Sequence, residues 1–149
     1  MSFDAPSLKG RALRLLSGRE YSRLELERKL NPYEEEPGSL AVALDDLQAK
    51  GFISEQRVLE SVVNRRTGKL GAARIKQELQ GKGLDPQAVA DAMTDLRATE
   101  LARAREVWSK KFGQPPEDAA QRAKQMRFLA GRGFGGDTIR RVVAGADDE

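Results

Sequence analysis

The sequence feature that most limits the possible folds of this chain is a short pattern that recurs three times. In "ELERKL", "ELQGKGL" and "FLAGRGF" an apolar residue is followed three positions later by a cation. The apolar residues are Leu26, Leu79 and Leu129, so the copies stand 53 and then 50 residues apart. Spacing of this length is typical of small helical units stacked in tandem. The simpler interpretation is that leucine followed by lysine and glycine is a common way for a helix to end.

Helix signals accompany this pattern along most of the chain. Ser22 followed by Glu25 forms a capping box, and Asp85 before Pro86 is a strong start signal. Gly51 stands where a glycine usually ends a helix. No segment shows the period-two alternation of a strand. These signals predict an all-α protein of tandem three-helix repeats, about three in number, that form an elongated and curved array. The predicted repeats span residues 8–52, 53–97 and 98–144, followed by a frayed acidic tail at 145–149.

The stretch "GRGFGG", residues 131–136, also satisfies G-x-G-x-x-G, the fingerprint of loops that bind dinucleotide phosphates. That loop requires a preceding strand, a following helix, and an acidic residue about 20 positions later. Here a helical pattern precedes the glycines and only 13 residues follow them. We therefore expect one helix that ends at Gly133 and a further short helix capped by Asp137. Upstream, residues 85–112 form either one long helix or two helices that meet near 97–99.

The composition excludes several kinds of site. The 149 residues include no cysteine and no histidine, which excludes disulfides, Cys/His zinc sites and catalysis by a thiol or an imidazole. The acidic pair Asp45-Asp46 and the acidic run 34–36 are typical of a solvated surface, and Trp108 is expected in the core. We therefore expect no catalytic residue, no cofactor and no metal, and a protein that is not an enzyme. No apolar run approaches the roughly 20 residues of a membrane span, and the first residues lack an export signal, so we expect a cytoplasmic protein.

The net charge of +3 is unevenly distributed. Residues 65–82 hold six cations and one carboxylate, and residues 122–141 hold the same numbers. Such clusters are suited to phosphates or to an acidic groove on another protein. The alternative is that each cluster is only the solvated face of a helix.

Residues 70–93 are typical of two helices joined by a short glycine turn, the layout of a helix-turn-helix DNA reader. The first of these helices carries cations. The second helix, residues 87–96, carries Asp91 and Asp95 and no cation before Arg97. A helix that enters the major groove needs the opposite charge, because it approaches the phosphates. A regulator that acts directly on duplex DNA therefore stays the alternative interpretation.

In five stretches, the chain resembles the RecX family of bacterial RecA regulators. The matching pieces are "ALRLLSGREYSRLELERKL", "LDDLQAKGFISEQRV", "GAARIKQELQGKGL", "WSKKF" and "KQMRFLAGRGF", in that order. The resemblance implies tandem three-helix repeats without an active site. It also implies binding to the RecA nucleoprotein filament, within the helical groove of that filament. There the family members suppress RecA ATP hydrolysis, strand exchange and co-protease activity, and some members bind DNA.

The charge clusters and the resemblance together suggest which residues meet the partner. We expect a monomer that binds the RecA filament, and single- or double-stranded DNA weakly and without sequence preference. The basic residues expected to face DNA phosphate or an acidic RecA surface are Arg65, Arg66, Arg74, Lys76, Lys110, Lys111 and Arg132.

Overall fold

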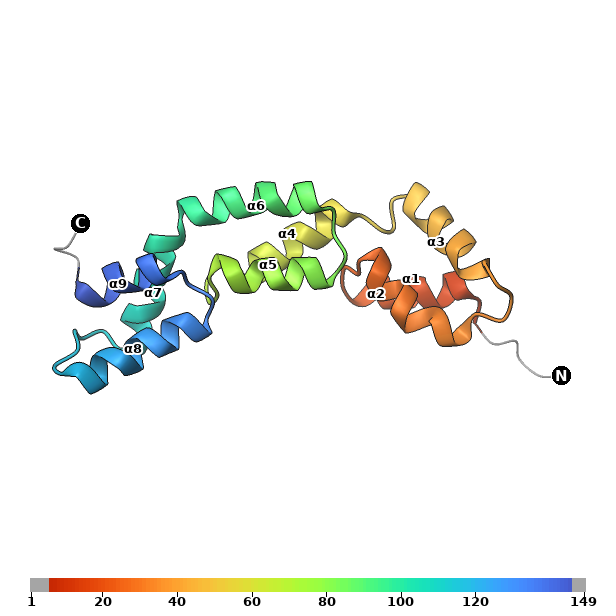
Figure 1. Ribbon diagram of the computed structural model, residues 1–149. Coiled ribbons are helices and arrows are strands. Elements are labelled where there is room, and N and C mark those ends of the chain that lie inside the picture. The colour runs from red at the N-terminus through yellow and green to blue at the C-terminus, as the bar shows by residue number, and fades with distance from the viewer. Residues whose placement is uncertain (1–5, 146–149) are drawn as a thin grey trace. The chain divides into compact units, whose positions relative to one another are not determined.

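The computed structural model describes residues 6–145, and within this range the chain is all α-helical (Figure 1). The described residues form nine α-helices and one short 3-10 helix, and they contain no strand. The prediction of an all-α fold is therefore confirmed. The chain divides into two compact units, and two of the boundaries between them fall within helices. Within the described residues, unit 1 comprises residues 6–61 with Gly81–Asp85, and unit 2 comprises Val62–Gln80 with residues 86–145.

Unit 1 is built around the helices of the first third of the chain. Its elements are α1 (Leu8–Gly18), α2 (Arg23–Leu30), the 3-10 helix η1 (Asn31–Tyr33), α3 (Ser39–Ala49) and the first half of α4 (Glu55–Arg66). Their apolar faces meet in one core, whose buried members are Ala12, Leu26, Leu30, Leu40, Leu44, Leu47 and Ile53.

The local signals in unit 1 act as the sequence indicates. The capping box is confirmed: the Ser22 hydroxyl accepts from the Glu25 N–H at 3.2 Å, and the Glu25 carboxylate accepts from the Ser22 N–H at 2.9 Å. Gly51 follows the end of α3 with a φ of +84°, in the left-handed region that glycine favours. After α2 the chain continues directly into the single turn η1, which has a proline in its first turn.

Unit 2 contains the rest of the chain. It includes the second half of α4, most of α5 (Ala72–Gly81), and then α6 (Pro86–Ala98), α7 (Glu100–Lys111), α8 (Ala119–Gly131) and α9 (Gly136–Ala144). Two helices, not one, occupy residues 86–111, because the chain leaves helical geometry at Thr99. The apolar residues buried between α7, α8 and α9 are Ala104, Leu129, Phe134, Ile139, Val142 and Val143.

The glycine-rich stretch joins two helices, so the helix-ending interpretation is confirmed. Gly133 has a φ of +93°, and the Phe134 N–H donates back to the Leu129 carbonyl at 3.3 Å. The Gly133 N–H donates to the Ala130 carbonyl at 3.0 Å, which completes the glycine-based end of α8. Phe134 is buried, with 5% of its surface exposed, because this turn folds it back onto the helix.

The expected cap of the last helix was wrong. The N-cap of α9 is Gly135, without a side-chain hydrogen bond, and Asp137 lies within the first turn. The backbone at Gly135 is extended and its N–H donates to the Glu100 carboxylate at 3.2 Å, so the helix begins one residue after this bond. Asp137 instead pairs with Arg140 at 2.8 Å.

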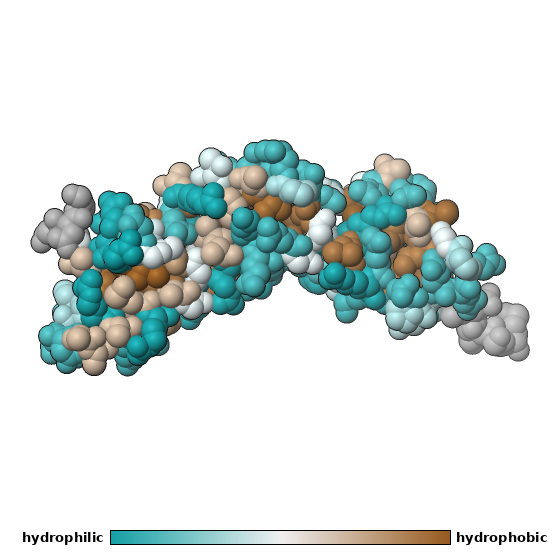
Figure 2. Space-filling model, in the orientation of Figure 1, coloured by the Kyte–Doolittle hydropathy of each residue, from teal (hydrophilic) through white to brown (hydrophobic). Residues whose placement is uncertain are grey.

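The three repeat boundaries stay a prediction, because the compact units do not follow them. Of the expected tail, residues 146–149 lie outside the described residues. On the face shown in Figure 2, hydrophilic residues cover much of each unit and apolar residues show between them. In the described part of the chain, none of the helices combines the length and the apolar character that a membrane span requires.

Candidate functional site

A basic hollow lies in unit 2, between the end of α4, the face of α5 and the end of α8. We call it the α5 hollow, and its volume is about 350 Å³. Its lining residues are Arg66, Lys69, Leu70, Arg74, Gln77, Glu78 and Arg132. Four cations and one carboxylate therefore surround it, which is a surplus of positive charge suited to an anion.

The only carboxylate of the lining is already occupied by arginines. Glu78 accepts from Arg66 Nε at 2.9 Å, and Arg65 Nη2 lies 3.9 Å from its other oxygen. Arg65 therefore stands beside the hollow through its contact with Glu78. Within the described residues, Lys69 makes no ion pair with a carboxylate, so its ammonium is available to a bound anion.

Arg74 is fixed in place by the end of α8. Its guanidinium donates to the Gly131 carbonyl at 2.5 Å. Its side chain also lies against the backbone at Gly133, where a Cβ would come within 2.3 Å of Arg74 Cγ. Arg74 thus has a structural role beside any role in binding, because it holds α5 to the turn after α8.

A buried carboxylate supports the same junction. Glu100, which is 9% exposed, accepts from the Ala72 N–H at 2.7 Å and from the Gly135 N–H at 3.2 Å. It therefore ties the start of α5 to the turn before α9. Two backbone donors are satisfied by one side chain, and this removes the cost of burying them unpaired.

Arg103 donates hydrogen bonds to backbone carbonyl groups, just as Glu100 accepts them from backbone N–H groups. Its guanidinium donates to the carbonyls of Thr67, Leu70 and Leu96 at 3.3, 2.8 and 2.9 Å. Burial lowers the pKa of Arg103, and the nearby charge of Glu100 opposes this shift. Sequence reasoning missed both Glu100 and Arg103. Each is one charged residue on an amphipathic helix, and no local signal distinguishes it from a solvated one.

The structure brings together some of the predicted site residues and separates others. Arg66, Arg74 and Arg132 line the α5 hollow, with Arg65 beside it. Lys76 is half-buried on α5 and is not part of the lining. Lys110 is exposed and pairs with Glu106 at 3.4 Å, within its own helix.

Lys111 is linked to the hollow through an aromatic ring. Its ammonium lies 5.3 Å from the centroid of Phe128, and the guanidinium carbon of Arg132 lies 4.9 Å from the same centroid. Phe112 packs edge-on against Phe128, with 5.5 Å between the ring centroids. The ring thereby holds two cations near each other without neutralising either.

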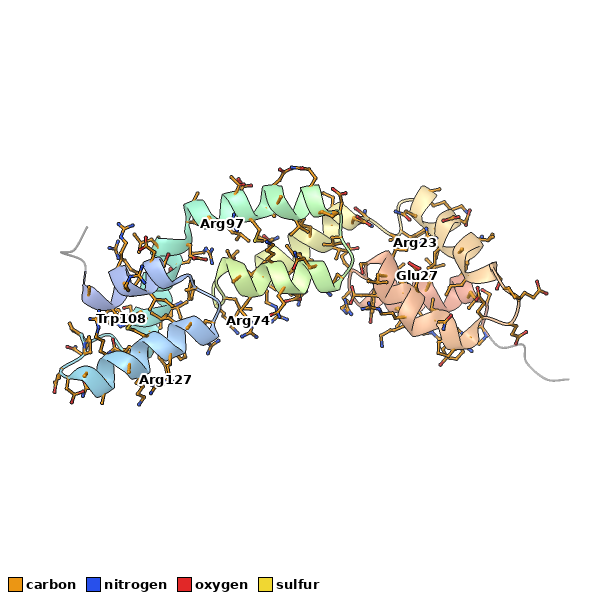
Figure 3. All side chains as sticks on the ribbon, in the orientation of Figure 1. Arg23, Glu27, Arg74, Arg97, Trp108 and Arg127 are labelled. Carbon is orange, nitrogen blue, oxygen red and sulfur yellow. The ribbon has the colours of Figure 1, made fainter. Side chains whose placement is uncertain are left out.

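Lys69 is not among the seven basic residues that the sequence analysis names as contacts, although it belongs to the basic cluster 65–82. The signal was present, but the sequence does not show which cations of a cluster share one hollow. Arg127 of the second cluster is exposed on α8 and points away from the helix bundle (Figure 3). It is not part of the lining.

Trp108 has a structural role, as expected. It lies on α7 (Figure 3) and is half-buried, and its indole N–H donates to the Gln125 side-chain oxygen at 2.8 Å. The Gln125 amide in turn donates to the Gln114 carbonyl at 3.0 Å. This chain of bonds fixes the connection between α7 and α8.

On the surface of α6, two carboxylates are exposed. Asp91 and Asp95 are both solvent-accessible, and Asp91 accepts from the Gln87 side chain at 2.9 Å. A second helix with this charge repels the phosphates on either side of a DNA groove. The second helix of the α5–α6 pair therefore lacks the positive charge that a DNA recognition helix needs.

The most specific comparison is with family models of three-helix domains. Residues 54–93 match the second three-helix domain of RecX, and residues 98–143 match the third. A regulatory protein RecX from Leptothrix cholodnii is 54% identical over 143 residues, which cover 96% of this chain and 91% of that protein. This chain belongs to the RecX family. A second relative of the same name, from Ralstonia pickettii, is 44% identical over 95% of this chain and 89% of its own length.

Solved structures of RecX proteins share the fold. RecX from Lactobacillus salivarius matches with a TM-score of 0.76 at 20% identity, over 94% of both chains. Another RecX crystal structure matches with a TM-score of 0.75 at 19% identity, over 93% of this chain and 72% of that one. The resemblance to the RecX family is thus confirmed, and with it the all-α fold. The family is one of regulatory proteins.

Proposed function

We propose that this RecX-family chain binds the RecA nucleoprotein filament and inhibits its ATP hydrolysis, strand exchange and co-protease activity. It acts as a cytoplasmic monomer, without a cofactor and without catalysis. The main support for this proposal is that a chain of the RecX family has the basic α5 hollow. Four cations line it, and its one carboxylate is already paired, so it is complementary to DNA phosphate or to carboxylates of RecA.

The lining of the hollow also divides the predicted contact residues into a central group and an outer group. The central contact consists of Arg66, Lys69 and Arg132, and Arg65 stands beside it through its contact with Glu78. Lys76, Lys110 and Lys111 lie outside the lining, so the proposal gives them only the role of edge charges in a wider contact. Edge charges mainly change the rate of encounter and its dependence on salt, whereas central charges change the affinity. Arg74 is a poor choice for a test, because its substitution disturbs the packing on Gly133.

The proposal is tested by a double charge reversal, Lys69→Glu with Arg132→Glu. Neither side chain pairs with a carboxylate among the described residues, so the fold should persist. We expect the concentration for half-inhibition of RecA ATP hydrolysis on single-stranded DNA to rise about tenfold. Circular dichroism and the midpoint of thermal unfolding establish that the variant is folded.

A matched control comes from the second basic cluster. Arg122→Glu with Lys124→Glu changes the net charge of the protein equally, from +3 to −1, at exposed positions outside the hollow. We expect this control to inhibit RecA nearly as the unchanged protein does. If the Lys69/Arg132 variant also inhibits fully, the hollow is not the contact. Inhibition lost equally in both variants would mean that overall charge, and not the hollow, determines binding.

Direct action on duplex DNA is the alternative function. Binding of the protein to duplex DNA, measured with and without RecA, distinguishes this function from filament regulation. A direct regulator shifts one defined duplex with strong sequence preference in the absence of RecA. A filament regulator shows weak shifts without preference and acts only when RecA is present. The exposed carboxylates of α6 favour the second outcome.

A further inference from the structure

A second basic hollow lies in unit 1, where the sequence shows no basic cluster. We call it the α1 hollow, and its volume is about 230 Å³. It lies between α1 and the end of α2, and its lining residues are Pro6, Arg11, Arg14, Leu15, Lys29, Leu30 and Tyr33. The lining includes three cations, three apolar residues and a tyrosine, and it includes no carboxylate.

The three cations of this lining differ from the other cations of unit 1. Six of the others make ion pairs, and the pairs are Lys9–Asp46, Arg19–Glu25, Arg23–Asp45, Lys50–Asp46, Arg57–Glu20 and Lys82–Glu25. Arg28 donates to the Gly81 carbonyl at 3.5 Å. Among the described residues, Arg11, Arg14 and Lys29 alone in this unit have neither kind of partner. Apart from Arg28, the cations of unit 1 that make no ion pair with a carboxylate thus all line this one hollow.

Arg11 is held in place without being neutralised. Its guanidinium carbon lies 3.8 Å from the centroid of the Tyr33 ring. A ring face attracts a cation but removes none of its charge, so the N–H groups at the edge of the guanidinium can still donate to an anion. Tyr33 itself is half exposed, at 50% of its surface.

We propose that the α1 hollow binds a short acidic peptide segment of a partner protein, anchored by one aliphatic side chain. Leu15, Leu30 and Pro6 provide an apolar wall for the anchor, and the three cations take the carboxylates on either side of it. The volume is below the roughly 300–1,000 Å³ of most small-molecule sites, and it suits a side chain better than a whole cofactor.

The surroundings favour a peptide over a nucleic acid. Tyr33 and Pro6 also line a neighbouring hollow, together with Glu35 and Glu36. A strand of nucleic acid that leaves the α1 hollow on this side would bring its phosphates against two carboxylates. Proteins that bind single strands also offer free aromatic faces to the bases, whereas Arg11 already covers a face of Tyr33. A short peptide needs only the hollow itself.

The test uses the full chain and a fluorescein-labelled peptide, Glu-Asp-Leu-Glu-Asp, followed by fluorescence anisotropy. No RecA is present, so a failure here is distinct from a failure of the proposed function. We expect Arg14→Glu with Lys29→Glu to weaken peptide binding about tenfold. The Arg122→Glu, Lys124→Glu protein again makes the same change of net charge, from +3 to −1, and should bind as the unchanged protein does.

Two further probes examine the anchor and the class of ligand. A peptide with serine in place of leucine should bind severalfold more weakly, and equal binding of both peptides would overturn the proposal. A short oligothymidylate should not displace the peptide. If it binds in place of the peptide and is lost in the Arg14/Lys29 variant, the hollow is a nucleic-acid site and the proposal is wrong. Should that variant fail to fold, Arg14→Gln with Lys29→Gln must still weaken binding severalfold.

Discussion

Glu25 connects three parts of unit 1 through one carboxylate. It accepts from Arg19 at 2.9 Å, from Lys82 at 3.0 Å, and from the N–H of Ser22 at 2.9 Å. Lys82 belongs to the segment Gly81–Asp85, which is distant in sequence and packs in the same unit. The capping residue of α2 therefore also attaches this segment to the helix.

The surroundings of Glu25 change its pKa. Burial alone would raise the pKa of this carboxyl group, but the hydrogen bonds from Arg19, Ser22 and Lys82 outweigh burial and lower it from 4.5 to about 2. Because the folded state holds the proton less tightly than the unfolded state, the stabilisation is fully present above about pH 4.5. It is lost as the pH falls from there toward 2.

We expect Glu25→Gln to lower the free energy of unfolding by about 1 to 2 kcal/mol at pH 7, because charged hydrogen bonds and the cap are lost. The difference from the unchanged protein should be smaller at pH 3. At that pH the carboxyl group of Glu25 is mostly protonated in the unfolded chain, so folding must first remove this proton. Urea unfolding at both pH values measures it.

Glu27→Gln is the matched control for this prediction. Glu27 lies on the same helix, is 47% exposed, and approaches Arg23 only at 3.8 Å. Exposed pairs of this kind contribute little, so we expect no measurable pH-dependent difference. A Glu25→Gln effect that stays constant between pH 7 and pH 3 would contradict the pKa argument.

At the scale of elements, one kind of close packing occurs twice. In unit 2 the start of α5 packs on the turn after α8, where Gly71 donates to the Arg132 carbonyl at 2.8 Å. In unit 1 the start of α2 packs on the turn after α5, where a Cβ on Gly83 would lie 2.8 Å from Leu24 Cδ2. Gly83 and Gly133 are 50 residues apart, and both have positive φ.

Gly71 is the most restricted contact of this kind. A Cβ there would lie 2.4 Å from the Gly133 carbonyl oxygen and 2.5 Å from the Phe134 nitrogen. Both are backbone atoms, so no side chain can rotate away. We expect Gly71→Ala to reduce the free energy of unfolding by about 1 to 3 kcal/mol, the usual cost of overpacking. Thermal or urea unfolding, followed by circular dichroism, measures this loss.

Gly81→Ala provides the comparison, because a Cβ at Gly81 meets no atom within 4 Å and its φ is not positive. Alanine at the end of α5 should be neutral or stabilise the protein by about 0.5 kcal/mol, since glycine costs helices conformational entropy. Equal stability of the two variants would show that the Gly71 junction can open without cost.

For the molecule as a whole, the proposed binding to RecA depends on which cations no carboxylate neutralises. Both hollows present positive charge to solvent, while most other cations of unit 1 are paired within the fold. In the proposed function, these unneutralised charges attract the polyanionic filament over a long range, and salt screens this attraction.

We expect inhibition of RecA ATP hydrolysis to weaken when added salt rises from about 0.01 M to about 0.15 M, because the screening length falls from about 30 Å to about 8 Å. Each rate is normalised to RecA alone at the same salt. The Lys69→Glu, Arg132→Glu variant should show a smaller dependence on salt, since fewer charges take part. An unchanged slope would exclude the α5 hollow from electrostatic binding.

Much of the fold could be predicted because its signals are local. The Ser22–Glu25 box, the glycine ends at Gly51 and Gly133, and the helical spacing of leucines each act within a few residues. The cap at Asp137 was wrong because a distant carboxylate, Glu100, holds the backbone of Gly135. The site was predicted only in part: its basic cluster was evident, but its members could not be separated into lining and non-lining residues.

The sequence by itself determined the helices, the absence of thiol and imidazole chemistry, the net charge and the family resemblance. Only the tertiary structure decided which cations are neutralised. Arg57 pairs with Glu20 and Lys82 with Glu25, and these partners are 37 and 57 residues apart. The first 50 residues are slightly acidic overall, yet their unpaired cations gather at the α1 hollow. Ion pairing depends on distance in space, so no count of charges along the chain reveals where positive charge remains.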